Sequence, residues 1–340
     1  MGPRIRSTTP PLSSPMVQAP SPASALPAQA PPPNWVASRH PIGWLIDRLL
    51  EVEPLRQLLF LQARRLIIRT AERRGIAWRA RRDELQRQAE PLLALSTDPA
   101  VVTPAYYQAR FHAYEAGNLC WAAACEAEQA TASMALRVWP AEELTADGAQ
   151  DRLRQAIFAA IEPSLPGPVH RALDMGCSVG VGTLALKEWL DGREGTDVAV
   201  EGLDLSPQML AVARARDPEG RIRGWHHAAA EASGLPAGSF DLITLQFVCH
   251  ELPADATRAV LAEAARLLHP GGVVALVDQD PDSEVIRRLP APIATLLKST
   301  EPYLEDYFSL DLPAALEQAG YCAVRRVACD PRHRVLVATR

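Results

Sequence analysis

Short apolar runs alternate with longer amphipathic stretches in the second half of the chain. The runs have the length of strands, and the apolar positions between them recur at helical spacing. They occupy residues 172–175, 198–203, 240–247, 273–277, 323–328 and 334–339. Strands that alternate with helices predict an α/β fold, in which helices cover both faces of a mostly parallel sheet.

The last two runs differ from the others in the length of their connection. Only residues 329–333 lie between them, which is too few for the helical crossover that joins parallel strands. We therefore expect these two runs to form an antiparallel hairpin at the C-terminal end of the sheet.

Residues 35–148 have another pattern and predict an α-helical N-terminal region. Apolar residues recur at helical spacing, and Pro54 separates two helices. These apolar residues are Leu45, Ile46, Leu49, Leu50, Leu58, Leu59 and Leu61. The arginines that we assign to the polar side of the second helix are Arg64, Arg65, Arg69, Arg73 and Arg74. This side is either the solvated face of a packed helix or a peripheral contact with an anionic membrane surface.

Residues 1–34 are rich in Pro, Ser and Ala and contain no acidic residue. Such a composition buries too little apolar surface to fold, so we predict a disordered tail. Arg4, Arg6 and the many hydroxyl side chains also fit an organelle transit peptide. The chain is therefore expected in the cytoplasm, with a plastid as the alternative if the tail is a transit peptide.

Composition narrows the classes of function. Hydrophobic residues make up 48% of the 340 residues, which is enough for a large core. A formal net charge of −5 argues against a general nucleic-acid binder. No apolar run reaches the roughly 18 residues that span a bilayer. The six cysteines have no Cys-x-x-Cys spacing and no accompanying His cluster, so we expect no metal site.

A glycine-rich loop follows the first apolar run and opens a helix over residues 181–190. It contains Gly176, Gly180 and Gly182. In open α/β sheets, ligands bind at the carboxyl ends of the strands, and glycines let the backbone approach them closely. Such a loop alone fits a dinucleotide and S-adenosylmethionine (SAM) equally well.

Two acidic residues help to separate these ligands. Asp174 precedes the loop, where its carboxylate would repel the phosphates of a dinucleotide. SAM has no phosphate, and its ammonium and sulfonium groups favour an acid at this place. Asp204 ends the second run, where a carboxylate accepts hydrogen bonds from both ribose hydroxyls of either ligand.

Further motifs follow in a fixed order. Glu231 lies in the stretch 230–236, Gln246 begins the stretch 246–251, and Gly271 and Gly272 lead into the run 273–277. Together these motifs resemble the class I SAM-dependent methyltransferases, in particular the ubiquinone/menaquinone C-methyltransferase-like group. The resemblance covers residues 169–340. It implies a Rossmann-like sheet of seven strands with SAM as the cofactor.

The resemblance also assigns roles to residues. It implies that SAM is bound by Asp174, Gly176, Ser178, Gly180, Asp204, Leu205, Ala230, Glu231 and Gln246. Residues 246–251 then face the reacting methyl group. Segments 111–115, 117–119, 299–303 and 330–334 resemble an uncharacterised cyanobacterial and plastid branch, which brings no known substrate.

The chain departs from the family pattern at two positions. Ser178 stands where the family has the middle glycine of the loop, and serine tolerates that turn less easily. Ala229 stands where the family has the acid that contacts the adenine amino group. Glu231 or a backbone carbonyl must then make the adenine contact.

Residues that handle the methyl acceptor are harder to assign. A base is needed only if the acceptor must lose a proton, and His250 is the first candidate, followed by Glu251. The alternative is that His250 only shapes the pocket. His112, Tyr114 and Asn118 would form a lid that selects the acceptor, or they belong to ordinary packing between regions.

We therefore predict a SAM-dependent methyltransferase that acts on a small molecule. The resemblance favours a hydrophobic acceptor. One alternative is a non-catalytic SAM-binding or interaction protein, because sites can decay on a retained fold. A second is a nicotinamide-dependent oxidoreductase. The oligomeric state stays open.

Overall fold

The computed structural model describes residues 33, 48, 52–112, 114 and 116–340. The predicted disordered tail, apart from Pro33, and most of the first predicted helix lie outside the described residues. Among the described residues, no helix has both the length and the apolarity needed to cross a membrane.

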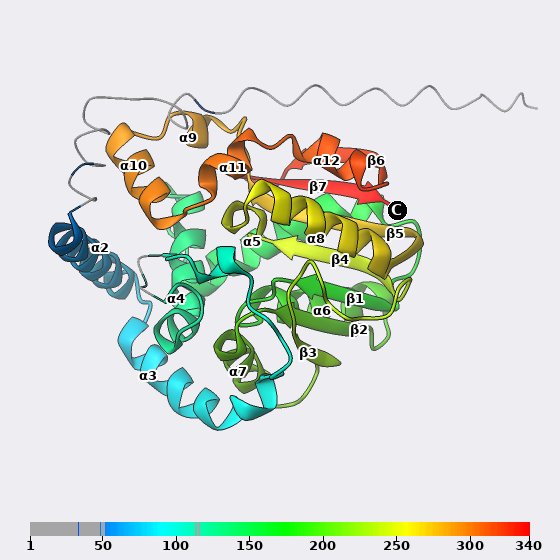
Figure 1. Ribbon diagram of the computed structural model, residues 1–340, viewed down its shortest axis with the longest axis horizontal. Coiled ribbons are helices and arrows are strands. Elements are labelled where there is room, and N and C mark those ends of the chain that lie inside the picture. Colours follow the sequence, from blue (N-terminus) through cyan, green and yellow to red (C-terminus); the bar gives the residue numbers. More distant parts are fainter. Residues whose placement is uncertain (1–32, 34–47, 49–51, 113, 115) are drawn as a thin grey trace, which may run out of the picture.

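A seven-stranded sheet forms the centre of the molecule (Figure 1). Its strands are β1 (Arg171–Met175), β2 (Ala199–Asp204), β3 (Gly224–His227), β4 (Phe240–Gln246), β5 (Leu268–Gln279), β6 (Cys322–Ala328) and β7 (His333–Thr339). Their order is β3-β2-β1-β4-β5-β7-β6. Strands β1 to β5 run parallel, and β7 pairs antiparallel with both β5 and β6. The predicted α/β fold and the C-terminal hairpin are confirmed.

Helices cover both faces of this sheet. Figure 1 shows α8 (Ala254–Leu267) in front of the sheet, with α5 (Ala146–Ile161) and α6 (Val181–Glu194) behind it. Successive side chains of a strand point to opposite faces. Accordingly, Leu173 and Met175 of β1 pack in the core that contains α8, whereas Ala172 packs in the core that contains α5 and α6.

The described part of the N-terminal region is helical except for the segment between its second and third helices. It forms α2 (Glu53–Arg73), α3 (Trp78–Ala89) and α4 (Trp121–Val138). Between α3 and α4 lie only the short 3₁₀ turns η1 (Glu90–Leu92), η2 (Ala94–Ser96) and η3 (Ala105–Gln108), with loops between them. The helical prediction was wrong for this segment.

The division that we predicted between residues 148 and 149 falls inside α5. Buried residues of α2, α3, α4 and α5 belong to the same hydrophobic cluster as β1 and β5. The helical region therefore shares a core with the sheet. Helix α7 (Pro207–Arg216) packs separately against α3 and α4.

Four helices lie between β5 and β6. They are α9 (Glu284–Arg287), α10 (Ala291–Thr300), α11 (Leu304–Ser309) and α12 (Leu312–Gln318). Two further 3₁₀ turns, η4 (Glu162–Ser164) and η5 (Cys249–Glu251), follow α5 and β4. Turn η5 lies beside the carboxyl ends of the parallel strands, where ligands bind in such sheets.

Candidate active site

A cavity of about 710 Å³ opens at the carboxyl ends of β1, β2 and β4. Its size suits a small-molecule site. Twelve loop, strand and turn residues that we predicted from the sequence, together with Tyr114, line it: Asp174, Gly176, Ser178, Asp204, Leu205, Ala230, Glu231, Gln246, His112, Asn118, His250 and Glu251. Gly180 is the one predicted residue outside the wall, and the roles of all of them stay predictions.

The loop after β1 has backbone conformations that explain its glycines. Gly176 has a φ of +77°, and a Cβ atom there would meet the Val248 side chain at 2.6 Å. Gly180 has a φ of +76°, and its Cβ would meet the Trp225 ring at 2.7 Å. Ser178 has a φ of 50°, a left-handed conformation that costs a residue with a side chain about 1–2 kcal/mol. The close approach of Trp225 thus requires a glycine at position 180, whereas Ser178 has a strained backbone conformation.

Asp174 is the penultimate residue of β1, and hydrogen-bond donors surround its carboxylate. One carboxylate oxygen accepts hydrogen bonds from Thr244 Oγ1 at 2.7 Å and Gln246 Nε2 at 3.1 Å. The other accepts from Thr183 Oγ1 at 2.7 Å. Burial raises the pKa of Asp174, while these hydrogen bonds and nearby Arg154 act to lower it. The carboxylate is therefore fixed in place at the cavity wall.

Arg154 of α5 is a wall residue that the sequence analysis missed. It is 8% exposed, and its Nη1 donates to Gln246 Oε1 at 2.6 Å. Its Nε has no hydrogen-bond partner among the described residues. Burial lowers the pKa of Arg154 to about 10, so it stays charged at neutral pH. The cavity thus holds a positive and a negative group close to Gln246.

Asp204 ends β2 and is 6% exposed. Its two oxygens accept the backbone N–H groups of Ser178 at 2.7 Å and Ser206 at 2.8 Å. Burial raises the pKa of Asp204 to about 6, although both backbone groups act to lower it. Each oxygen keeps a further lone pair, so the carboxylate is able to accept more hydrogen bonds.

The wall beyond Asp204 contains Ala230 and Glu231. Glu231 Oε1 accepts a hydrogen bond from the hydroxyl of Tyr106 at 2.7 Å. Its Oε2 is buried and has no partner among the described residues. Tyr106 lies in η3, 125 residues earlier in the chain, so the sequence contains no signal for this pairing. Ala229 has no polar side chain, whereas Oε2 of Glu231 is available to accept a hydrogen bond from a ligand.

The carboxylate of Asp278 holds His250 in place. Asp278 Oδ1 lies 2.9 Å from Nδ1 of His250, and Asp278 Oδ2 accepts the backbone N–H of His250 at 3.1 Å. Burial acts to lower the pKa of His250, but the carboxylate of Asp278 outweighs it and raises the pKa to about 9. Asp278 is a positioning group that the sequence analysis did not single out.

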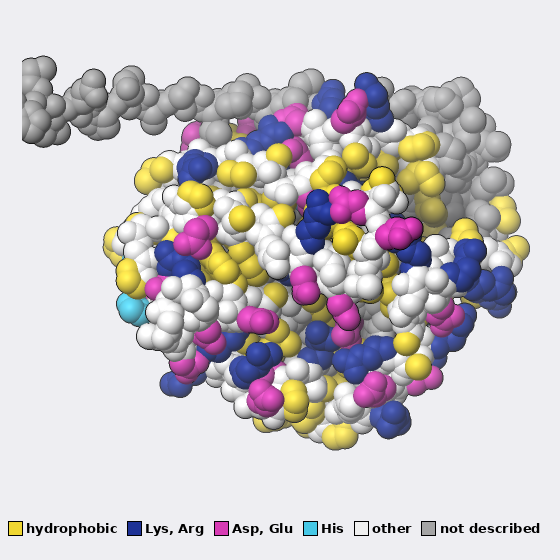
Figure 2. Space-filling model, turned by 180° about the vertical axis from the view of Figure 1, so that it is seen from behind, with side chains coloured by type: hydrophobic (Ala, Val, Ile, Leu, Met, Phe, Trp, Pro, Cys, Tyr) yellow, Lys and Arg dark blue, Asp and Glu magenta, His cyan; other side chains and the backbone are white. Residues whose placement is uncertain are grey.

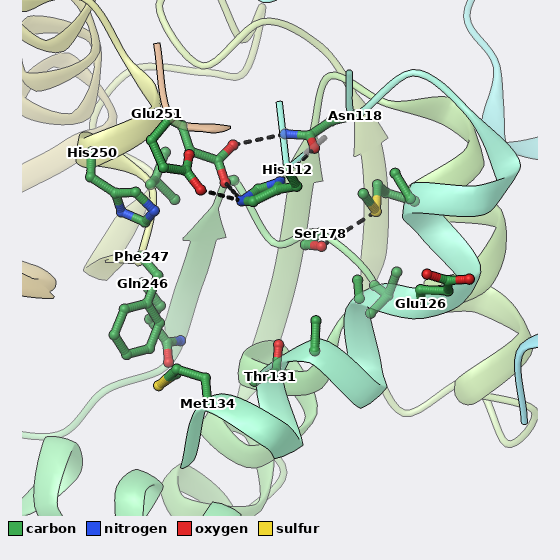
Figure 3. Close-up of a pocket in the computed structure, with 18 of the residues that line it drawn as sticks. His112, Asn118, Glu126, Thr131, Met134, Ser178, Gln246, Phe247, His250 and Glu251 are labelled. Carbon is green, nitrogen blue, oxygen red and sulfur yellow. Dashed lines mark hydrogen bonds and ion pairs between the residues drawn. The ribbon is translucent and has the colours of Figure 1, made fainter. Parts of the chain in front are cut away.

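Residues from three distant segments meet next to His250 (Figure 3). His112 Nε2 lies 3.0 Å from Glu301 Oε1 and 3.4 Å from Glu251 Oε1. Asn118 Nδ2 donates to Glu251 Oε2 at 2.8 Å. Burial acts to lower the pKa of His112, but Glu301 and Glu251 outweigh it and raise the pKa to about 10. This end of the cavity is polar and acidic.

Tyr114 connects the cavity wall to α2. Its hydroxyl donates to Glu126 Oε2 at 2.7 Å and accepts from Arg64 Nη1 at 2.9 Å. Arg64 also pairs with Glu126, which is fully buried. Arg64 is half-buried rather than fully solvated, because an acid buried in α4 pairs with it.

Apolar side chains of α2 and α10 line another part of the cavity, beside the charged side chain of Arg64. Helix α2 contributes Phe60 and Ile67, and helix α10 contributes Ile293, Leu296 and Leu297. Ile67 is 40% and Ile293 is 51% exposed. The surface seen in Figure 2 otherwise shows basic and acidic side chains interspersed with apolar ones. A bound molecule would therefore meet apolar side chains near α2 and α10, and polar side chains near His250.

Comparison with known proteins bears on this site. Residues 173–276 match the family described as "Methyltransferase domain". An uncharacterized methyltransferase of Synechocystis sp. is 28% identical over 53% of this chain and 78% of that protein. A ubiquinone/menaquinone biosynthesis C-methyltransferase of Methylobacterium nodulans is 36% identical over 41% of this chain. The chain spans only about half, 54%, of that second relative.

Solved structures give a weaker likeness. The apo form of the S-adenosylmethionine-dependent methyltransferase SibL is 24% identical and covers 58% of this chain and 57% of its own, with a TM-score of 0.44. The matched residues 173–276 run from β1 to β5 and contain the loop, Asp174, Asp204 and Gln246. Residues 173–276 thus form a methyltransferase domain.

Proposed function

We propose that the protein transfers the methyl group of SAM to a small molecule that has a polar reactive end and an apolar body. The proposal rests on the observation that different parts of one cavity are lined by side chains of different character. Buried carboxylates lie at the ends of β1 and β2 on one side, a polar cluster surrounds His250, and apolar side chains of α2 and α10 form an apolar wall.

The residues beside the loop fit the groups of SAM. Asp174 and Arg154 offer opposite charges to the ammonium and carboxylate of its amino-acid part. Asp204 accepts hydrogen bonds from the ribose hydroxyls, and the unpartnered Oε2 of Glu231 accepts from the adenine amino group. Gly176 adopts the left-handed φ of +77° with which the loop turns at the end of β1.

When bound, SAM supplies an electrophilic methyl carbon, which bonds to a lone pair of the acceptor as the electrons of the breaking carbon–sulfur bond return to sulfur. The chain's own contribution is to hold both molecules in line and to exclude water. We propose that His250 contacts the acceptor and that Asp278 orients its ring. We propose that His112, Tyr114 and Asn118 fix the reactive end of the acceptor.

The class of acceptor follows from the apolar wall. Phe60 and Leu297 would cover an apolar body, and contact of such a body with these side chains releases water favourably. The Methylobacterium nodulans relative is named for ubiquinone/menaquinone biosynthesis, which supports an acceptor with an apolar ring or tail. A peripheral contact of α2 with a membrane that stores such molecules remains a prediction, as does the cellular compartment.

The two alternatives predict different ligands. A nicotinamide dinucleotide would bring its phosphates to the end of β1, where the carboxylate of Asp174 opposes them. A non-catalytic SAM-binding protein would bind SAM without consuming it. A non-catalytic SAM-binding protein would have no need of the polar cluster around His250.

Methyl transfer is tested with SAM that carries a labelled methyl group and a small-molecule extract as the source of acceptors. We expect label in an extractable product, and we expect His250→Ala to lower its rate while the Kd for SAM stays within about twofold, because His250 lies outside the loop. Calorimetry gives the Kd. SAM binding without any labelled product would favour the non-catalytic alternative, and tighter binding of NADH than of SAM would favour the oxidoreductase.

A further inference from the structure

The cluster of His112, Glu251 and Glu301 has a composition that the methyl-transfer proposal does not explain. One imidazole and two carboxylates meet at the cavity, and one ligand atom from each lies within 4.8 Å of the others. They come from the loop before α4, from η5 and from the end of α10. Two carboxylates that approach one another in this way require a positive charge between them, and a protonated His112 supplies it in the metal-free protein.

The hydrogen bonds around the cluster orient it. Asn118 Oδ1 lies 3.3 Å from Nδ1 of His112, and Asn118 Nδ2 donates to Glu251 Oε2 at 2.8 Å. A metal ion would displace the proton of His112 Nε2, and with the remaining proton on Nδ1 the lone pair of Nε2 would face the ion. Metal-binding histidines are held in this way by an oxygen acceptor on the opposite ring nitrogen. Asn118 thus fixes two of the three groups at once.

The third group has an unused acceptor. Glu301 is 6% exposed, and its Oε2 is buried without a hydrogen-bond partner among the described residues. A buried carboxylate oxygen that lacks a partner is unfavourable, because it has lost its hydrogen bonds to water without replacing them. Its Oε1 faces His112 Nε2 at 3.0 Å. A ligand with positive charge at the cluster would satisfy this carboxylate.

We propose that His112, Glu251 and Glu301 bind a divalent metal ion at the acceptor end of the cavity. Metal bonds to nitrogen and oxygen of about 2.1 Å place neighbouring ligands of an octahedral ion roughly 3.0 Å apart. The two distances from His112 Nε2 are 3.0 and 3.4 Å, so small side-chain movements admit the ion. Cysteine spacing led us to expect no metal site, but this cluster contains no cysteine and its residues lie far apart in the sequence.

The ligand set indicates the kind of ion. Carboxylates suit Mn²⁺ and Mg²⁺, whereas an imidazole favours first-row transition metals. One imidazole with two carboxylates therefore favours Mn²⁺ over Mg²⁺ and leaves coordination positions open. These positions face the cavity, because all three residues line it.

An open coordination position beside the methyl acceptor would let the ion contact the acceptor directly. It would bind an oxygen atom of the acceptor, which selects acceptors with a hydroxyl, carbonyl or carboxylate at the reactive end. This task rests on the proposed function, whereas the ion site does not. Glu251 would then hold the ion, which excludes it as the base that we considered from the sequence.

Binding is tested by titrating Mn²⁺ into the full-length protein and following the free ion by electron paramagnetic resonance. We expect saturable binding of one ion per chain, weaker by about tenfold or more in Glu301→Gln and in His112→Asn. Asparagine tolerates the left-handed backbone of residue 112, whose φ is 53°. Nitrogen coupling from an imidazole should disappear in His112→Asn.

Glu317→Gln is the matched control, because Glu317 is an exposed residue of α12 that does not line the cavity. Circular dichroism and the Kd for SAM report whether each variant is folded. Absence of saturable binding, or unchanged binding in both Glu301→Gln and His112→Asn, would overturn the ion site. Saturable binding in a protein that transfers no methyl group would instead contradict the proposed function alone.

Discussion

Asp204 shows how one buried carboxylate connects the loop to the second strand. It accepts the backbone N–H of Ser178, the residue in a left-handed conformation, as well as that of Ser206. The hydrogen bond to Ser178 helps to hold the strained backbone in place. Any change in the charge of Asp204 therefore affects both the loop and a ligand bound beside it.

The pH dependence of SAM binding should follow this residue. The pKa of Asp204 is raised to about 6, and ribose hydroxyls donate to its ionised form. Affinity is therefore complete above about pH 7 and falls as the pH decreases through 6. Calorimetry between pH 5 and pH 8 measures this change. Asp204→Asn should bind more weakly and lose the dependence near pH 6; an unaltered profile in that variant would refute the assignment.

At the scale of elements, α2 is attached to the rest of the molecule by few buried residues. Ile68 and Ala71 are its buried apolar residues among those described. Arg64 adds the contacts with Tyr114 and Glu126. Because α2 also forms part of the apolar wall, these contacts position the surface that we assign to the acceptor.

Removing Arg64 should therefore loosen α2. Arg64→Ala leaves Glu126 buried without its shortest ion pair, which should lower the free energy of unfolding by about 1–3 kcal/mol. Urea unfolding followed by circular dichroism measures this difference. Arg65→Ala is the control, since Arg65 is exposed on the same helix and its loss should change the stability little. Equal effects of the two variants would contradict the anchoring role.

The sequence predicted elements where apolar residues follow a regular pattern. Six strands were found in this way, but β3 was not, because its four residues, Gly224–His227, include two histidines and present no apolar run. The long-range contacts could not be predicted either. Nothing in the local pattern indicates that Glu301 approaches His112 or that Asp278 supports His250. Such pairs depend on the three-dimensional path of the chain.

The positions of the predicted cofactor residues follow from the sequence pattern, whereas the positions of the predicted lid residues do not. Asp174, Asp204 and Gln246 are at strand ends, and the alternation of strands and helices fixes where strand ends gather. His112 and Asn118 are in a loop, where the helical prediction failed. Their place in the cavity depends on contacts with η5 and α10 that the sequence does not display.

At the scale of the whole molecule, the cavity joins the N-terminal helices, the sheet and the helices between β5 and β6. A ligand that fills it should stabilise the complete fold. At a SAM concentration about 100 times the Kd, we expect the free energy of unfolding to rise by about 2.7 kcal/mol. Thermal unfolding with and without SAM measures this.

Two comparisons test whether the stabilisation is specific for SAM and for the proposed SAM-binding residues. Arg154→Met removes the positive group near Gln246, so at the same SAM concentration we expect a smaller increase in the unfolding temperature. NADH should leave the unfolding temperature of the unchanged protein as it is. A larger increase with NADH than with SAM would contradict the cofactor assignment.

The position of β7 between β5 and β6 affects how the protein is made. Strand β7 covers the edge of β5, for example where Val273 pairs with Thr339. Because β7 lies near the C-terminal end of the sequence, the ribosome synthesises it after all the parallel strands. An uncovered edge pairs readily with other chains. Nascent chains that stall before His333 should therefore need chaperone protection, even though their SAM-binding loop is already complete.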